Sequence, residues 1–186
     1  MRIIAGEFRG RKILPPATGA TRPITDRAKQ SVFDVLSPRL PGAIVYDVFA
    51  GTGSLGLECL SRGCQHATFF ESERSAIALL EQNITTLDVR DRATIVRGDV
   101  FQWFARAAEP AQKPDLIFLD PPYRFLSERP AELRSLVHKI VSSHFSRTGL
   151  LVFRHERSDT LEFDGLRAAE VKDYGDMRVE FLSHVD

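Results

Sequence analysis

The chain has 186 residues, of which 43% are hydrophobic and 27% are charged. This length and composition fit one globular domain with a sizeable core, and they exclude a disordered or collagen-like chain. No stretch reaches the roughly 18 apolar residues that a membrane-spanning helix needs, and the N-terminus lacks the apolar core of a signal peptide. We therefore expect a cytoplasmic protein.

The two cysteines, Cys59 and Cys64, are too few for a disulfide framework and are interpreted as small core residues.

The charge is distributed unevenly along the chain. The formal net charge is zero, which argues against binding to nucleic acid through bulk charge alone. Residues 1–40 nevertheless carry eight Lys/Arg and three Asp/Glu, a net charge of +5, and the remainder carries −5. The basic residues of this segment either form a phosphate-facing patch or belong to a solvated arm. They are Arg2, Arg9, Arg11, Lys12, Arg22, Arg27, Lys29 and Arg39.

The first 40 residues read as an extension that precedes the main domain. The pattern predicts two short strands within residues 2–14, paired as a hairpin. Prolines and glycines then predict a loop over residues 15–24. A helix follows, with Thr25 or Asp26 as its N-cap and its end before Pro38.

From residue 41 onward, apolar runs alternate with amphipathic stretches, which is typical of a parallel sheet with crossover helices. The end of the chain, residues 167–182, predicts an antiparallel hairpin that turns at Gly175 and Asp176 and joins the sheet edge. The predicted strands are 44–48, 67–71, 93–97, 116–119 and 150–153, and the predicted helices are 55–61, 74–87, 100–107 and 132–143.

A glycine-rich segment follows the first of these strands directly. Residues 51–56 match Gly-x-Gly-x-x-Gly between a strand and a helix, the context in which such a loop binds a ligand. One candidate ligand is a dinucleotide, whose pyrophosphate would lie at the helix N-terminus. The other is S-adenosylmethionine, which has no phosphate and carries an ammonium, a sulfonium and a carboxylate. A tight turn without a ligand is the remaining interpretation.

Three acidic residues at strand ends are candidate ligand contacts. Asp47 either holds the amino-acid part of S-adenosylmethionine or caps the strand end. Glu71 follows Gly51 by 20 residues, where a carboxylate accepts hydrogen bonds from both ribose hydroxyls of either cofactor. Asp99 either contacts an adenine amino group or caps the next helix. These acids indicate a nucleoside-containing cofactor without deciding between the two.

The end of the fourth predicted strand carries the most specific motif, Asp120-Pro121-Pro122-Tyr123. Two prolines stiffen the backbone and remove two N–H donors, so that carbonyl and carboxylate oxygens face the crevice. Such a site suits an exocyclic amine whose hydrogens are held by Asp120 and the Pro121 carbonyl, because positioning is the main requirement for methyl transfer. Tyr123 would stack on the target base, a contact worth about 1–3 kcal/mol. A loop cap and a packed ring are the alternative roles.

Four segments of the chain together resemble the bacterial RsmD family, whose members methylate guanine N2 in small-subunit (16S) ribosomal RNA. The resemblance covers essentially the whole chain. The Asp-Pro-Pro-Tyr string is shared with DNA and protein amino-methyltransferases, whereas the early Arg-Pro-x-x-Asp-Arg segment points to this family. The four segments are residues 22–27, 47–58, 120–123 and 174–176.

The resemblance implies an α/β, Rossmann-like fold of the class I S-adenosylmethionine-dependent methyltransferases, with Asp120, Pro121, Pro122 and Tyr123 as the catalytic loop. It also implies that the hairpin and the segment 22–27 bind RNA. The implied substrate contacts are Arg22, Thr25 and Arg27, and structural pairing of the arginines with Asp26 or another acid is the alternative. The implied cofactor contacts are Asp47, Gly51, Gly53, Glu71 and Asp99, with Phe49, Ala50 and Val100 beside them as further candidates.

Other functions remain open from the sequence. A nicotinamide-dependent dehydrogenase would use the glycine loop but leave the Asp120 motif without a role. A DNA methyltransferase with the same loop is the main alternative, and a non-catalytic RNA-binding assembly factor is a third. A cytosine-C5 enzyme needs a cysteine in the catalytic loop, where neither Cys59 nor Cys64 lies. The five histidines show no metal-ligand spacing, so no metal is expected. The expected partner is small-subunit ribosomal RNA, free or within a 30S particle.

Overall fold

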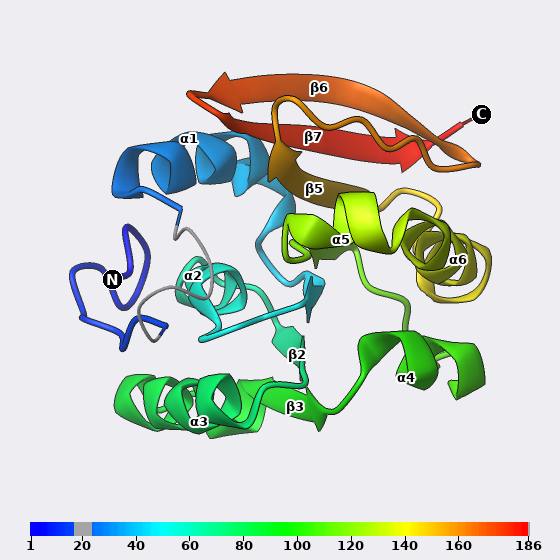
Figure 1. The fold of residues 1–186 in the computed structure, drawn as a ribbon. Helices are drawn as coiled ribbons and strands as arrows, with labels where there is room; N and C mark the ends of the chain where they lie inside the picture. The colour runs from blue at the N-terminus through cyan, green and yellow to red at the C-terminus, as the bar shows by residue number, and fades with distance from the viewer. Residues whose placement is uncertain (17–23, 186) are drawn as a thin grey trace.

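The computed structural model describes residues 1–16 and 24–185. Its centre is a seven-stranded sheet with the strand order β3-β2-β1-β4-β5-β7-β6 (Figure 1). Strands β1 to β5 run parallel to one another, and β7 pairs antiparallel with both β5 and β6. The strands are β1 Ile44–Val48, β2 His66–Glu71, β3 Ala93–Arg97, β4 Leu116–Leu119, β5 Leu150–Glu156, β6 Leu166–Tyr174 and β7 Met177–His184.

Helices cover both faces of the sheet, which explains why its central strands are nearly continuous apolar runs. Alternate residues of a strand point to opposite faces, so Val45 of β1 belongs to the core cluster with residues of α1, α2 and α3, whereas Tyr46 belongs to the cluster with residues of α4 and α6. In the described ranges, every helix is too short or too polar to cross a membrane. The helices are α1 Asp26–Leu36, α2 Ser54–Ser61, α3 Arg74–Leu87, α4 Val100–Arg106, α5 Arg124–Glu128 and α6 Pro130–Lys139, with short 3-10 turns at Ser37–Arg39 and Arg90–Arg92 and a π-helical turn at Ile140–His144.

The predicted mostly parallel sheet with a C-terminal antiparallel hairpin is confirmed. Strands β1, β3 and β4 and helix α3 have the predicted bounds. Strand β5 continues to Glu156, three residues beyond its predicted end. Helix α5 was not predicted, because its five residues are too few to show a helical apolar period.

The N-terminal segment differs from its prediction. Instead of two strands, its described residues form one isolated antiparallel bridge between Arg2 and Lys12. The turn between them is closed by backbone hydrogen bonds, such as that from the Gly10 amide to the Ile3 carbonyl at 2.9 Å. Ile3, Phe8 and the apolar side of α1 belong to the same core cluster as the sheet, so this segment packs against the main domain rather than standing apart.

A buried carboxylate ties the N-terminal segment to α2. Glu58 is fully buried and accepts hydrogen bonds from the amides of Ile4 and Ala5 at 2.8 and 3.0 Å. It also forms ion pairs with Lys29 of α1 and Arg62, both at 2.9 Å. Lys29 is therefore not part of a phosphate-facing patch, which corrects the sequence-based interpretation. Its side chain is only 3% exposed, and its ammonium neutralises Glu58 inside the protein.

The same helix approaches the N-terminal backbone closely at Ser61. The Ser61 hydroxyl donates to the Ala5 carbonyl at 2.6 Å and accepts from the Phe8 amide at 3.0 Å. A Cβ atom at Gly6 would lie 1.9 Å from the Ser61 carbonyl oxygen, and Gly6 has a φ of +83°. Only glycine permits this contact, since any side chain there would force the two segments apart.

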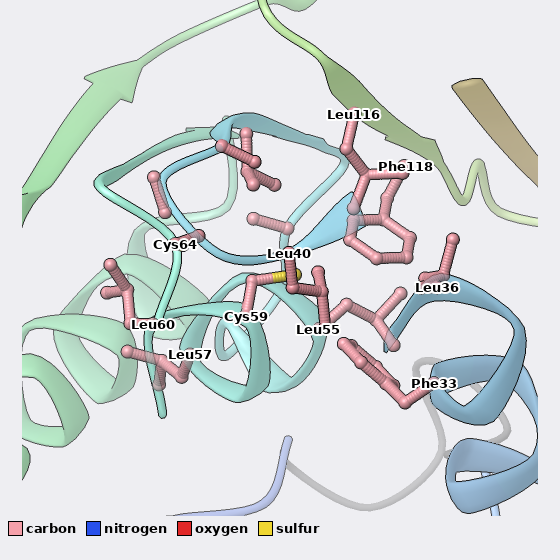
Figure 2. Close-up of a cluster of buried hydrophobic side chains, with 14 of the residues drawn as sticks. Phe33, Leu36, Leu40, Leu55, Leu57, Cys59, Leu60, Cys64, Leu116 and Phe118 are labelled. Carbon is pink, nitrogen blue, oxygen red and sulfur yellow. The ribbon is translucent and has the colours of Figure 1, made fainter. Parts of the chain in front are cut away.

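Helix α1 joins the core through Phe33 and Leu36, which lie beside α2 and the sheet residue Phe118 (Figure 2). Cys59 and Cys64 lie in the same cluster, 0% and 2% exposed, which confirms their interpretation as small core residues. Burial raises the pKa of both thiols, that of Cys64 to about 12. Neither thiol is a nucleophile under ordinary conditions.

Candidate active site

A cavity of about 820 Å³ lies at the carboxyl ends of the parallel strands. Open α/β sheets bind their ligands at this edge, and the volume falls within the usual range for small-molecule sites. The cavity brings together all four residues of the predicted catalytic loop and all but one of the predicted cofactor residues. These are Asp47, Phe49, Ala50, Gly51, Glu71, Asp99, Val100, Asp120, Pro121, Pro122 and Tyr123.

Gly53 is the predicted cofactor residue that does not line the cavity. It is the N-cap of α2 with a φ of +82°, and a Cβ atom there would lie 2.4 Å from Cδ1 of Leu80 in α3. The left-handed backbone favours glycine at this position, and the Leu80 methyl group would have to move to admit a side chain. The loop therefore meets the cavity through Gly51, Thr52 and Ser54 instead.

Two of the predicted acids hold the backbone of the loops around the cavity. Glu71 accepts hydrogen bonds from the Gly51 amide at 2.7 Å and from the amides of Ser72 and Glu73 at 2.8 Å each. Asp99 accepts from the Phe101 amide at 2.8 Å and so caps α4, one of its two predicted roles. Both carboxylates also border the cavity, where they present negative charge to a ligand.

Asp47 is a carboxyl group buried beneath the glycine loop. It is 1% exposed and accepts a hydrogen bond from the Gly56 amide in α2 at 2.9 Å. Burial raises the pKa of this carboxyl to about 7, with Asp120 and Glu71 adding to the effect against the opposing Gly56 hydrogen bond. A carboxyl with such a pKa is poised to become ionised when a cation binds next to it.

Replacing Asp47 with asparagine is expected to stabilise the unliganded protein and to weaken cofactor binding. Because the pKa of Asp47 is raised in the folded chain to about 7, the folded state loses stability as the pH rises from about 4 to about 7. Asparagine removes this loss, so the midpoint of thermal unfolding at about pH 8 should rise. The affinity for S-adenosylmethionine, measured by calorimetry, should fall about tenfold or more through loss of a charged hydrogen bond. A less stable variant with unchanged affinity would contradict this assignment.

Aromatic rings line the part of the cavity near Asp99. The ring centroids of Phe49, Phe101 and Phe125 lie 5.9–6.2 Å apart, and the Arg129 guanidinium lies 4.1 Å from the centroid of Phe101. Phe49 has a φ of +66°, which is uncommon for a non-glycine residue and occurs more often at functional sites. These rings pack against one another at tilted and edge-on angles and give this part of the cavity an apolar wall. Phe101, Phe125 and Arg129 were not predicted from the sequence, although each follows a predicted motif closely.

The turn at Asp120 presents oxygen acceptors to the cavity. The carbonyls of Pro122 and Tyr123 accept from the amides of Phe125 and Leu126 at 2.8 and 3.1 Å, so they are used in starting α5. Among the described residues, no donor bonds the Pro121 carbonyl. The acceptors left at this turn are therefore the Asp120 carboxylate and the Pro121 carbonyl, the pair that the sequence predicted.

The charge of the cavity fits S-adenosylmethionine better than a dinucleotide. Five Asp/Glu and three Arg are among the described residues that line it. Each of these arginines is paired: Arg129 with Glu132 at 2.5 Å, Arg124 with Glu128 at 3.9 Å and Arg154 with Asp120 at 2.6 Å. Since Asp120 is the only lining acid in these pairs, four of the five acids have no arginine partner among them. A pyrophosphate would be repelled by such a lining, whereas an ammonium and a sulfonium would be attracted. Within the described part of the chain, no three His, Cys, Asp or Glu side chains are grouped as metal ligands.

The predicted substrate contacts lie on and before α1. Arg22 falls outside the described residues. Thr25 is the N-cap of α1 and accepts a hydrogen bond from the Ala28 amide at 3.2 Å, so its hydroxyl has a structural role. Arg27 is exposed, and Asp26 pairs with Arg2 at 2.7 Å rather than with Arg27.

The tip of the C-terminal hairpin is fixed to the same helix. The Tyr174 hydroxyl donates to the Ser31 hydroxyl of α1 at 2.8 Å, and Gly175 makes the turn with a φ of +64°. Figure 1 shows this end of β6 and β7 lying over α1. Helix α1 and the late Tyr-Gly-Asp string therefore lie next to each other.

Known proteins with related sequences and structures agree with this arrangement. A family model described as "Conserved hypothetical protein 95" matches residues 1–183. "Putative rRNA methyltransferase YlbH" of Bacillus subtilis is 34% identical over 84% of this chain and 83% of its own length. "Ribosomal RNA small subunit methyltransferase D" of Escherichia coli is 38% identical over 67% of this chain, which spans 61% of that relative. The solved structure of "Putative methyltransferase yhhF" from Escherichia coli superposes with a TM-score of 0.83 at 30% identity, covering 99% of this chain and 97% of its own. The chain adopts the S-adenosylmethionine-dependent methyltransferase fold and belongs to the RsmD family, which that model describes.

Proposed function

We propose that this protein transfers a methyl group from S-adenosylmethionine to the exocyclic N2 amine of a guanine in small-subunit ribosomal RNA. The observation that carries this proposal is the turn at Asp120 and Pro121, whose two acceptors border the same cavity as the candidate cofactor residues. The rRNA substrate is supported by the names of the related proteins from Bacillus subtilis and Escherichia coli.

The residues of the turn orient the amine. S-adenosylmethionine, when bound, supplies a methyl group attached to a positively charged sulfur. Asp120 and the Pro121 carbonyl accept hydrogen bonds from the two amine hydrogens, which directs the nitrogen lone pair away from the turn. Tyr123 borders the cavity next to them and stacks on the flipped base. The rigid prolines keep these groups in place, and such positioning is worth up to about 7–11 kcal/mol in the best intramolecular cases.

The remaining cavity residues hold the cofactor. Asp47 and Gly51 take the amino-acid part, Glu71 takes the ribose hydroxyls, and Asp99 contacts the adenine amine. The adenine ring packs against the apolar wall of Phe49, Phe101 and Phe125 described above. Because Glu71 also holds three backbone amides, its loss would disturb the loop as well as the ligand.

Residues 1–40 form the RNA contact in this proposal. Arg2, Arg9, Arg11, Lys12 and Arg27 are exposed, and they would neutralise phosphates near the cavity. The target guanine is expected in an unpaired loop, because the base must leave its stack to reach the turn and the A-form major groove is too narrow to read. The reaction takes place in the cytoplasm, on free ribosomal RNA or on a 30S particle.

Removing the arginines of the early segment is expected to weaken RNA binding and its salt dependence. Each arginine that contacts a phosphate contributes about one unit to the slope of log K against log salt concentration. The Arg22→Ala/Arg27→Ala double variant should therefore bind small-subunit RNA with a slope shallower by about 2. Filter binding at several salt concentrations measures this slope, and Arg134→Ala, an exposed arginine of α6, is the matched control. An unchanged slope would remove these arginines from the RNA contact.

The proposal is tested by the identity of the methylated nucleoside. The protein is incubated with isotopically labelled S-adenosylmethionine and, separately, with small-subunit rRNA, 30S particles, large-subunit rRNA and DNA. We expect label in the first or second sample, and N2-methylguanosine after digestion and mass spectrometry. Label in DNA alone would favour the DNA methyltransferase alternative, and label on another atom would contradict the assignment of the turn.

A further inference from the structure

Arg154 of β5 holds both functional side chains of the catalytic turn. Its Nε atom lies 2.6 Å from Oδ1 of Asp120, and its guanidinium carbon lies 5.8 Å from the ring centroid of Tyr123. The register of the sheet produces this contact. Leu119 of β4 pairs with Phe153 of β5, so the next residues of the two parallel strands, Asp120 and Arg154, lie side by side at the carboxyl edge.

The environment of this ion pair is largely shielded from water. The side chain of Arg154 is 10% exposed and that of Asp120 is 18% exposed, and both border the cavity. A buried arginine destabilises the folded state unless it is paired. The residues of β5 that share its face, Leu150 and Val152, are apolar core residues, so packing alone does not explain an arginine at position 154. Arg154 donates a hydrogen bond to Oδ1 of Asp120, whereas no described residue donates one to Oδ2. The pairing therefore leaves one carboxylate oxygen as the acceptor at the cavity.

We propose that Arg154 is a positioning residue that keeps the Asp120 carboxylate ionised and turned with Oδ2 toward the incoming amine, while its guanidinium fixes the ring of Tyr123. This inference rests on the proposed function and adds a residue outside the four-residue motif. Arg154 acts through Asp120 and Tyr123 and need not touch the substrate itself.

The charged groups around Asp120 make its protonation depend on Arg154. Burial raises the pKa of Asp120, and Arg154 opposes this by its positive charge and its hydrogen bond. From the neighbouring strands, Asp47 of β1 lies close enough to interact with Asp120, and Glu71 of β2 and Lys29 of α1 interact with Asp47 in turn. Tyr123 is the titratable neighbour within the turn itself. Without Arg154, Asp120 is left among acids and should become protonated at a higher pH.

A protonated Asp120 carboxyl group accepts a weaker hydrogen bond from the amine than the ionised carboxylate does. The rate of methyl transfer in a variant without Arg154 should then rise with pH over a range in which the unaltered protein is already fully active. A purely structural role for Arg154 would lower stability or binding but would not move this pH dependence.

The experiment compares Arg154→Met, which keeps the side-chain length, Arg154→Lys, which keeps the charge, and Arg157→Met as the matched control. Arg157 follows the end of the same strand, is 61% exposed and pairs with Asp173 on the surface. Single-turnover methylation of the accepted rRNA substrate is measured from about pH 6 to about pH 9. We expect Arg154→Met to lower the rate at neutral pH about tenfold or more and to shift the acidic limb to higher pH. Arg154→Lys should recover part of both changes, and Arg157→Met should match the unaltered protein.

A second readout is independent of turnover. The carboxyl resonances of isotopically labelled aspartate are titrated by NMR, with Asp120 assigned through Asp120→Asn. The resonance of Asp120 should titrate at a higher pH in Arg154→Met, or in Arg154→Lys if the methionine variant does not fold. If the unaltered protein methylates no nucleic acid, the proposed function fails while this titration still tests the pairing. An Asp120 titration and a pH profile that stay the same without Arg154 would overturn the inference.

Discussion

The Asp120→Asn variant is expected to lose methyl transfer by about 100-fold or more while binding S-adenosylmethionine within a few-fold of the unaltered affinity. Asparagine keeps the shape of the side chain but replaces one acceptor oxygen with an NH2 group and removes the charge that pairs with Arg154. The amine would then lose one of its two hydrogen-bond acceptors, and the Tyr123 ring would lose part of its support.

The measurement is a single-turnover rate with saturating cofactor and RNA, together with calorimetry of cofactor binding. Because Arg154 loses the charge of its Asp120 partner in this variant, thermal unfolding must be recorded alongside, and the rate compared at a temperature where both proteins are folded. Glu109→Gln, an exposed acid paired with Lys113, serves as a charge-matched control. Loss of cofactor binding with an unchanged rate per bound cofactor would show that Asp120 belongs to the cofactor site instead.

The largest effect on stability is expected from Glu58→Gln. This change removes the negative charge that Lys29 and Arg62 share, and it leaves the ammonium of Lys29 buried without a counter-ion. Breaking a buried ion pair in this way typically costs about 3–5 kcal/mol of the free energy of unfolding. Glu58 also accepts from the amides of Ile4 and Ala5, so hydrogen exchange at these two amides should become faster.

Urea unfolding and amide hydrogen exchange measure the two effects. The double variant Lys29→Met/Glu58→Gln should be more stable than the sum of the two single changes predicts, because the buried ammonium is gone and only Arg62 has lost its counter-ion. The exposed pair of Glu109 and Lys113 again provides the comparison, since breaking it should cost only about 0–1 kcal/mol. A Glu58→Gln protein as stable as the unaltered one, with protected amides at Ile4 and Ala5, would show that this carboxylate does not hold the N-terminal segment.

Most of the fold was predictable because its central strands are short apolar runs between glycine and proline signals. Strands β1 and β4 lie between such residues and β3 ends directly before Gly98, and the bounds of all three were predicted correctly. The end of β5 was not, because the polar residues Arg154 and His155 break the apolar run although both are buried in the structure. The N-terminal strands were overpredicted because tertiary contacts with Glu58 and Ser61, rather than a ladder, satisfy that backbone.

In the site, the motifs formed by consecutive residues were predicted, whereas the contacts between residues far apart in the sequence were not. The turn at Asp120 and the loop at Gly51 are each formed by consecutive residues directly after a parallel strand. Their place at one sheet edge therefore follows from the strand order alone. The partner of Asp120 comes from another strand 34 residues later and depends on the register between β4 and β5. From the sequence, Lys29 belongs to a phosphate-facing patch or to a solvated arm; the structure shows neither, and nothing in its own segment reveals that Glu58 lies beside it.

The central claim is tested most directly by a crystal structure of this protein with S-adenosylhomocysteine and an RNA fragment that carries the methylated guanine. The account predicts that the sulfur lies next to the turn, with the guanine N2 amine bonded to Asp120 and the Pro121 carbonyl and the base against Tyr123. A complex in which this turn faces away from the sulfur, or in which the RNA cannot reach it, would contradict the account.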